Sequence, residues 1–154
     1  MLGRMYEGEN CSAARALELV GERWSLLIIR DALFAGSTRF GDFQRGLGVA
    51  TNILSTRLDG FVNAGLMEKR RQAGKAEQYE YVLTEKGRDL QPAIIALSAW
   101  GDRWAAPNGA PIVYTHADCG GPLRQHLQCE VCGQDAAASE VVPQPGPGLT
   151  LPVG

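Results

Sequence analysis

Apolar residues in the first 65 positions recur at intervals of three and four, which predicts a series of four helices. The second helix is apolar around much of its circumference, so we expect it to be central and buried. Ser12 is placed to cap the first helix and Gly21 to end it. The four predicted helices cover residues 13–20, 23–34, 40–47 and 50–63.

The fourth predicted helix has one apolar face and one polar face. Its apolar side chains fall within about 100° of a helical wheel, and its small polar side chains lie on the opposite arc. The apolar set is Leu54, Leu58, Phe61 and Val62, and the polar set is Asn52, Ser55, Thr56 and Asp59. One face can therefore pack on a core while the other faces outward.

A β-hairpin is predicted after the fourth helix. The runs 66–72 and 78–83 flank a polar turn, and large apolar side chains alternate along the second run. Thr84 then caps a predicted long helix that carries an acid in its first turn. An apolar stripe follows that helix at spacings of 4, 3, 3 and 4: Leu90, Ile94, Leu97, Trp100 and Trp104.

The order helix, helix, short helix, helix, hairpin, helix is typical of a winged helix-turn-helix, a mainly α fold with one small β-hairpin. Alone, a polar helix face or a basic run is ordinary solvated surface, but together in this order they favour DNA binding. We expect base contacts from the fourth helix through Thr51, Asn52, Ser55 and Thr56. We expect phosphate contacts from Arg23, Arg39, Arg57, Lys69, Arg70, Arg71 and Lys75.

Length, composition and charge limit this prediction. The 154 residues, 45% hydrophobic and 21% charged, fit one globular domain with an appendage. No apolar run approaches the ~20 residues of a membrane span, and no secretory signal is visible, so we expect a cytoplasmic protein. Residues 1–110 carry 14 basic and 13 acidic side chains, whereas residues 111–154 carry one and four. With a net charge of −2, any nucleic-acid surface must be a local patch.

The chain carries a series of motifs in a fixed order: CSA at 11–13, ALELVGERW at 16–24, RFGDF at 39–43, EYVLTEKG at 80–87 and LSAWG at 97–101. Over roughly residues 11–105 the chain resembles the HxlR-type winged helix regulators. The resemblance implies a bacterial-type transcription factor that binds operator DNA as a homodimer through its first and last helices. The chain departs from the family at Ser12, where a proline is usual, and in the hairpin, which lacks a usual proline.

The last predicted helix supports a dimer independently of the resemblance. Leu97, Trp100 and Trp104 share one face, although a core helix would show the same stripe. With Leu17 of the first helix, they are the predicted dimer interface. Two-fold symmetry then predicts a near-palindromic operator.

Cys11 lies just before the first predicted helix, where the helix dipole favours a thiolate and Arg15 is one turn away. For Cys11 we favour a small side chain packed in the dimer seam. In several HxlR-type proteins a cysteine at this place senses oxidants or electrophiles, and the resemblance implies this role as the alternative. A small molecule in the dimer cleft is a further candidate effector.

After a linker at 107–111 the chain becomes rich in cysteine and glycine, with a short strand expected at 112–114 and no internal repeat. His116, Cys119, Cys129 and Cys132 form two close pairs separated by a short loop, a spacing that suits tetrahedral zinc. His126 is an alternative to His116. Free thiols or a disulfide are the other interpretations. A zinc ion held by four protein ligands would be structural, because no coordination position stays open for substrate.

We therefore divide the chain into a flexible arm (1–10), a DNA-binding and dimerisation domain (11–106), a small Cys/His extension (112–142) and a Pro/Gly-rich tail (143–154). The predicted function is that of a transcriptional repressor or activator, and not that of an enzyme. A thiol redox enzyme would use Cys129 and Cys132, but that motif needs a preceding strand and a following helix. A zinc-held adaptor for other proteins is a third class, and it is compatible with DNA binding.

Overall fold

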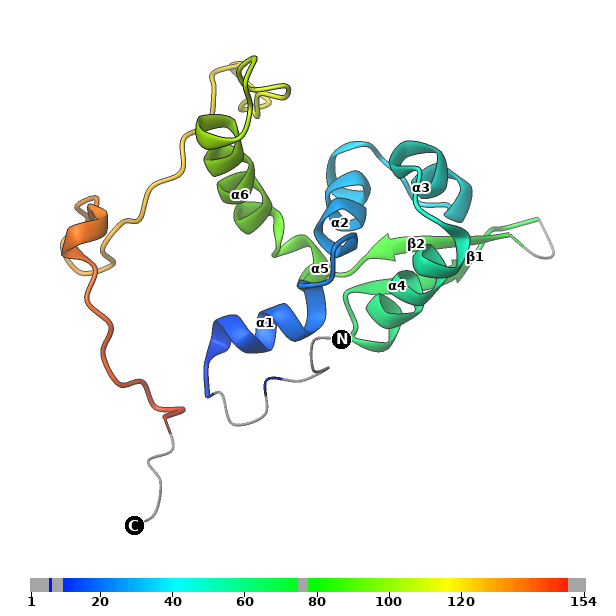
Figure 1. Ribbon diagram of the computed structural model, residues 1–154, viewed down its shortest axis with the longest axis horizontal. Coiled ribbons are helices and arrows are strands. Elements are labelled where there is room, and N and C mark those ends of the chain that lie inside the picture. The colour runs from blue at the N-terminus through cyan, green and yellow to red at the C-terminus, as the bar shows by residue number, and fades with distance from the viewer. Residues whose placement is uncertain (1–5, 7–9, 75–77, 150–154) are drawn as a thin grey trace, which may run out of the picture. The chain divides into compact units, whose positions relative to one another are not determined.

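The computed structural model describes residues 6, 10–74 and 78–149, and the chain forms two compact units, Met1–Ile94 and Ile95–Gly154. Helix α6 (Gln91–Trp104) begins in the first unit and continues into the second, where Ala138–Glu140 form a short 3-10 turn. The first unit has the predicted winged helix-turn-helix order (Figure 1). Its elements are α1 (Ser12–Val20), α2 (Ser25–Phe34), α3 (Phe40–Leu47), α4 (Thr51–Asn63), β1 (Met67–Arg71), β2 (Tyr79–Leu83) and α5 (Glu85–Arg88).

The core of the first unit lies between α2, α3, α4 and the hairpin. Helix α2 is central, as its apolar pattern predicts, and Ile28 and Ile29 are completely buried. Tyr81 and Leu83 of β2 join the same cluster from the hairpin. Other large buried side chains include Phe43, Leu54, Leu58, Phe61, Leu66 and Met67.

The turn between α3 and α4 depends on a glycine. Gly48 has a φ of 64°, in the left-handed region that a side chain disfavours, and its N–H donates to the carbonyl of Gln44 at 2.9 Å. This cap ends α3 within one residue of Leu47 and lets the chain re-enter a helix at Thr51. The helix-turn-helix is therefore set by local backbone chemistry.

The hairpin is a two-stranded antiparallel sheet in which Lys69 pairs with Tyr81 and Arg71 pairs with Tyr79. Its inner strand is anchored to the helices, because the Tyr81 N–H donates to the carbonyl of Thr38 at 2.7 Å. The predicted hairpin is confirmed, and its base is fixed to the segment between α2 and α3.

The prediction of one long helix from Thr84 is wrong, because two helices occupy that stretch. Thr84 is indeed an N-cap, and its hydroxyl accepts the Gly87 N–H at 3.2 Å, but α5 ends at Arg88. Pro92 lacks the N–H that would continue the helix from Arg88, so a new helix begins with proline in its first turn. That helix is α6, the long C-terminal helix.

Two smaller predictions also differ from the structure. Ser12 is the first residue of α1, and Cys11 occupies the N-cap position without a side-chain capping bond. Residues 112–114 lie outside any strand, because the nearest backbone pairing joins Thr115 to Pro122 within a tight local hairpin. The predicted flexible arm falls mainly on residues outside the described part of the chain. Across residues 6, 10–74 and 78–149, the helices are all too short or too polar to span a membrane.

Candidate nucleic-acid interface

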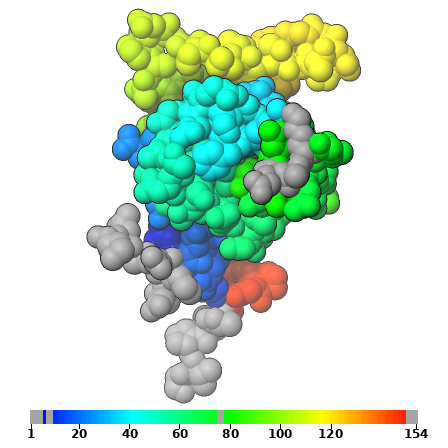
Figure 2. Space-filling model, turned by 90° about the vertical axis from the view of Figure 1, so that its right-hand side faces the viewer, coloured from blue at the N-terminus to red at the C-terminus, as the bar shows by residue number. Residues whose placement is uncertain are grey.

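Helix α4 turns a small polar face to solvent because its apolar face is fixed in the core by Leu54, Leu58 and Phe61. Three of the four residues predicted to contact bases, Thr51, Asn52 and Thr56, are exposed, and Ser55 is half-buried. Helix α4 packs beside β1 and α3 beside β2. In Figure 2 the surface of α3 and α4 continues into that of the hairpin. Helix and wing therefore offer one continuous face.

The polar groups of α4 differ in how far they are already engaged. The Thr51 hydroxyl accepts from Gln44 Nε2 at 2.8 Å, and the Thr56 hydroxyl donates to the Asn52 carbonyl at 2.9 Å. Both hydroxyl oxygens keep acceptor capacity, whereas the Thr56 proton is used within the helix. Asn52 keeps both donor and acceptor atoms on an exposed amide, so it is the side chain best suited to pair with an adenine edge.

Arg57 has a structural partner. Its Nη2 lies 3.0 Å from Glu22 Oε2, and its side chain is only 27% exposed. This ion pair ties α4 to the turn between α1 and α2. The guanidinium of Arg23, in the same turn, lies 5.5 Å from the centre of the Trp24 ring. A phosphate contact by Arg57 would compete with Glu22, whereas Arg23 is exposed.

The hairpin separates its basic side chains onto two faces because successive residues of a strand point to opposite sides. On one face, Lys69 Nζ lies 4.7 Å and 5.6 Å from the ring centres of Tyr79 and Tyr81. Arg71 lies on the same side, 5.9 Å from the Tyr79 ring. Lys69 and Arg71 thus form a cationic face backed by tyrosines.

The other face of the hairpin carries Arg70, which is matched by acids. Arg70 Nη2 lies 2.7 Å from Glu68 Oε2, and Arg70 stands opposite Glu80 in the strand register. Its charge is therefore balanced locally, whereas Lys69 and Arg71 have no acidic partner among the residues that the structure describes. The predicted contact from Lys75 lies outside the described residues.

A hydrogen bond from Arg71 to the Tyr79 hydroxyl links the wing side chains. This bond, with the positive charge of Arg71, lowers the pKa of Tyr79, and the same contact raises the pKa of Arg71. Both groups are exposed at the surface of the wing. An exposed arginine is suited to a backbone phosphate.

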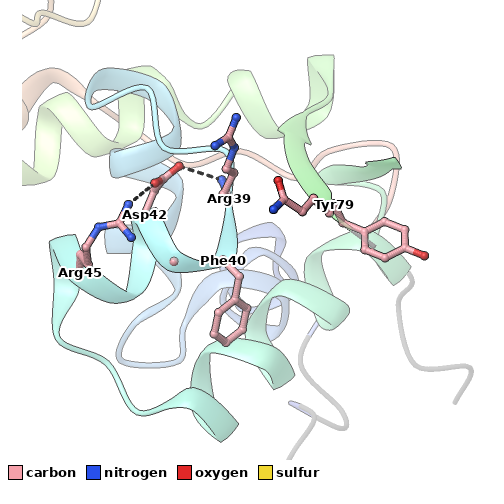
Figure 3. Close-up of a pocket in the computed structure, with 7 residues that line it drawn as sticks. Arg39, Phe40, Asp42, Arg45 and Tyr79 are labelled. Carbon is pink, nitrogen blue, oxygen red and sulfur yellow. Dashed lines mark hydrogen bonds and ion pairs between the residues drawn. The ribbon is translucent and has the colours of Figure 1, made fainter. Parts of the chain in front are cut away.

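An open hollow of about 310 Å³ lies between the start of α3 and β2 (Figure 3). The Asp42 carboxylate accepts the Arg39 backbone N–H at 3.2 Å and pairs with Arg45, while Arg39 Nε lies 3.8 Å from Glu80. Arg39 and Arg45 thus stand at the rim of the helix-turn-helix. Arg45, in the last turn of α3, was not among the predicted phosphate contacts.

The predicted dimer residues are all exposed. Leu17 on α1 is 47% exposed, and Leu97, Trp100 and Trp104 on α6 are 54%, 62% and 65% exposed. Arg103 lies over the Trp104 ring at 4.8 Å from its centre. Of the apolar stripe on α6, Ile94 is therefore buried in the core, whereas Leu97, Trp100 and Trp104 are not.

All four cysteines are exposed and free. His116 Nδ1 and Cys119 Sγ are 3.5 Å apart, and the backbone N–H groups of Cys132 and Val131 hydrogen-bond to Cys129 and lower its pKa. His126 is engaged elsewhere, with its Nδ1 2.9 Å from Asp135. Within the described ranges, no three potential ligands stand close enough together to hold a metal ion. The predicted four-ligand set is thus arranged as two separate pairs.

Comparisons with known proteins agree with this geometry. Residues 19–109 match the model of the HxlR-like helix-turn-helix family. The chain is 47% identical over 149 residues to the HTH-type transcriptional regulator Rv3095 of Mycobacterium tuberculosis, covering 96% of this chain and 92% of that protein. PA1607, described with its crystal structure as a transcription factor, superposes with a TM-score of 0.79 at 38% identity, over 89% of this chain and 96% of its own. The reduced form of the Bacillus subtilis regulator YodB matches 65% of this chain and 99% of its own, with a TM-score of 0.54 at 28% identity.

Proposed function

This chain belongs to the HxlR-like helix-turn-helix family, and we propose that it binds a near-palindromic operator as a homodimer. The chain is a DNA-binding transcriptional regulator and not an enzyme. One observation carries the proposal for the DNA face: the exposed amide of Asn52 and the cationic face of Lys69 and Arg71 belong to elements that pack against each other. Asn52 would read a base edge while the wing holds the backbone.

The homodimer is supported by the apolar stripe of α6. Leu97, Trp100 and Trp104 stay more than half exposed in the single chain, and large exposed apolar side chains in one stripe are typical of an interface. A two-fold dimer presents two recognition helices related by the same axis, so each would read the same half-site.

The test is binding of the full-length protein to a duplex from its own upstream region, followed by fluorescence anisotropy over a salt series. We expect a steep loss of affinity with salt, because each phosphate contact contributes about 0.9 to the slope of log K against log salt. Arg71→Ala removes one phosphate contact from each subunit of the dimer, so it should lower that slope by about 1.8 and weaken all sequences alike. Arg70→Ala is the matched control, and it should change the slope less because Glu68 already partners Arg70.

Asn52→Ala should instead relax the preference at one base position and leave the salt slope in place. The assignment of α4 as the recognition helix is wrong if Asn52→Ala and Arg71→Ala act identically on a panel of single-base operator variants. An absence of binding at every salt concentration would overturn the proposed DNA face itself.

We also propose oxidant control through Cys11. Its thiol is free and exposed at the N-cap position of α1, where an oxidant can reach it. The same titration with a mild oxidant should show release that thiol reverses. Cys11→Ser should bind DNA without that response, and a response that persists in the variant would place the sensor elsewhere.

A further inference from the structure

The structure of the Cys/His extension shows a repeat that the sequence pattern had not predicted. Two short hairpins, residues 114–123 and 127–136, have the same backbone hydrogen bonds at the same relative positions. In each, the fourth residue after the first potential ligand is a left-handed glycine: Gly120 with a φ of 69° and Gly133 with a φ of 70°. Both hairpins are tight turns of the kind that presents two side chains on one side.

Three backbone hydrogen bonds define the match, counted from His116 in the first hairpin and from Cys129 in the second. The backbone N–H of the first potential ligand donates to the carbonyl of the residue five positions later. That residue is Gly121 in the first hairpin, at 2.8 Å, and Gln134 in the second, at 2.9 Å. The glycine N–H donates back to the first ligand's carbonyl at 2.8 Å and 2.9 Å. The third bond closes each hairpin, from Leu123 to Tyr114 and from Ala136 to Leu127, at 2.9 Å and 2.8 Å.

This register makes His116 equivalent to Cys129, and Cys119 equivalent to Cys132. His126 has no counterpart in the repeat, because it lies in the three-residue connection between the hairpins and contacts Asp135. The structure therefore distinguishes the two histidines that spacing alone left as alternatives. His116 is the one held in a ligand-bearing turn.

The first pair already has the separation that a shared metal would require. With Zn–N of about 2.0–2.1 Å and Zn–S of about 2.3 Å at a tetrahedral angle, neighbouring donor atoms stand about 3.6 Å apart. His116 Nδ1 and Cys119 Sγ are 3.5 Å apart. The first hairpin thus holds its two donor atoms at the separation expected for half of a four-ligand site.

The extension also lacks any other evident source of stability. None of the described residues from 95 to 149 is buried, and Val131, at the tip of the second hairpin, is 95% exposed. Segments below about 40 residues usually need a disulfide, a metal or a partner to hold their shape. A disulfide between Cys129 and Cys132 would hold only one hairpin and would leave the first pair without a role.

We propose that residues 114–136 form a structural zinc module in which the two hairpins close on one Zn²⁺ through His116, Cys119, Cys129 and Cys132. The three-residue connection keeps the two hairpins next to each other, since Leu123 and Leu127, at its two ends, can be at most about 14 Å apart. Zn²⁺ replaces the thiol protons of the three cysteines, and the released protons pass to solvent. Four protein ligands fill the coordination sphere, so the ion holds the module together and takes no substrate.

The test uses full-length protein, purified under reducing conditions, stripped with a chelator and titrated with Zn²⁺ or Co²⁺. We expect one Zn²⁺ per chain, and Co²⁺ in its place should give the d–d bands of a tetrahedral site with thiolate-to-cobalt charge transfer. Cys119→Ser and Cys132→Ser, one from each hairpin, should each lower the Zn²⁺ affinity by more than about 100-fold, beyond what changes outside the ligand shell produce. The controls His126→Ala and Cys11→Ser should bind Zn²⁺ like the unaltered protein.

A second readout follows the fold of the module itself. Zn²⁺ should protect the backbone amides of residues 114–136 from hydrogen exchange and leave those of the winged helix unit unchanged. Three results would overturn the proposal. They are a reduced protein that takes up no Zn²⁺, a Cys119→Ser variant that binds it normally, or half a Zn²⁺ per chain that depends only on Cys129 and Cys132. The last result would indicate a site shared between two copies.

Discussion

Replacing Gly87 by alanine should destabilise the winged helix unit, because the backbone passes too close to this residue to admit a side chain. A Cβ at position 87 would lie 2.2 Å from the carbonyl oxygen of Leu66 and 2.8 Å from Leu83 Cδ2. The first neighbour is backbone and cannot rotate away. The turn at α5 and the segment that follows α4 would have to separate by about 1 Å to reach ordinary contact distance.

That separation would strain several hydrogen bonds that join the two segments. The Leu66 carbonyl accepts the Thr84 N–H at 3.1 Å, the Thr84 hydroxyl donates to the Gly65 carbonyl at 2.6 Å, and Lys86 Nζ donates to the Ala64 carbonyl at 2.8 Å. Loss of two or three such bonds at about 0.5–1.5 kcal/mol each gives a cost of about 1–4.5 kcal/mol. A cost of this size is in the range that overpacking produces.

Urea denaturation at a fixed protein concentration, followed by circular dichroism, measures this change in the free energy of unfolding. Gly60→Ala is the matched control, since Gly60 lies in α4 and a Cβ there would meet nothing within 4 Å beyond the adjoining turns of its own helix. Alanine there should stabilise the protein by roughly 0.4–1 kcal/mol through its higher helix propensity. A Gly87→Ala variant within about 0.5 kcal/mol of the parent would refute the steric reasoning, because surface substitutions alone produce changes of that size.

Two further predictions concern the other surfaces. Trp104→Glu should convert the proposed homodimer to monomer in sedimentation equilibrium, because it would bury a charge in an apolar interface; a variant that stays dimeric would show that the stripe of α6 is not the contact. Deletion of all residues after Ala110 should leave DNA affinity unchanged in the anisotropy assay, since the candidate DNA face lies wholly in the first unit; a loss of binding would give the extension a direct part in recognition.

Several boundaries could be predicted from the sequence because they depend on local chemistry. The apolar periodicity places α2, α3 and α4 correctly to within two residues, and Gly48 ends α3 because only a residue without a side chain adopts its φ easily. The long helix expected from Thr84 fails for a reason that was equally local. Pro92 interrupts the backbone ladder although the apolar stripe runs on through it.

The state of several basic side chains could not be predicted in this way, because it depends on residues far apart in the chain. Arg57 forms an ion pair with Glu22, which is 35 positions away in the sequence. This contact forms only when α4 packs near the turn before α2. Lys69 and Arg71 are separated from Arg70 by the strand alternation, but the tyrosines that back them come from β2.

The sequence by itself thus determined the helices and strands from α1 to β2, and which residue types could bind DNA or metal. The tertiary structure decided which of those residues are available, because ion pairing and burial depend on neighbours brought together by folding. It also revealed that His116 and Cys129 are equivalent, since the backbone hydrogen bonds of the two hairpins match although their side chains differ. The periodicity of apolar residues and the spacing of ligands can be read within one segment of the chain. Whether a side chain is free to bind, and which ligand positions are equivalent, depends on backbone and side-chain contacts that form only on folding.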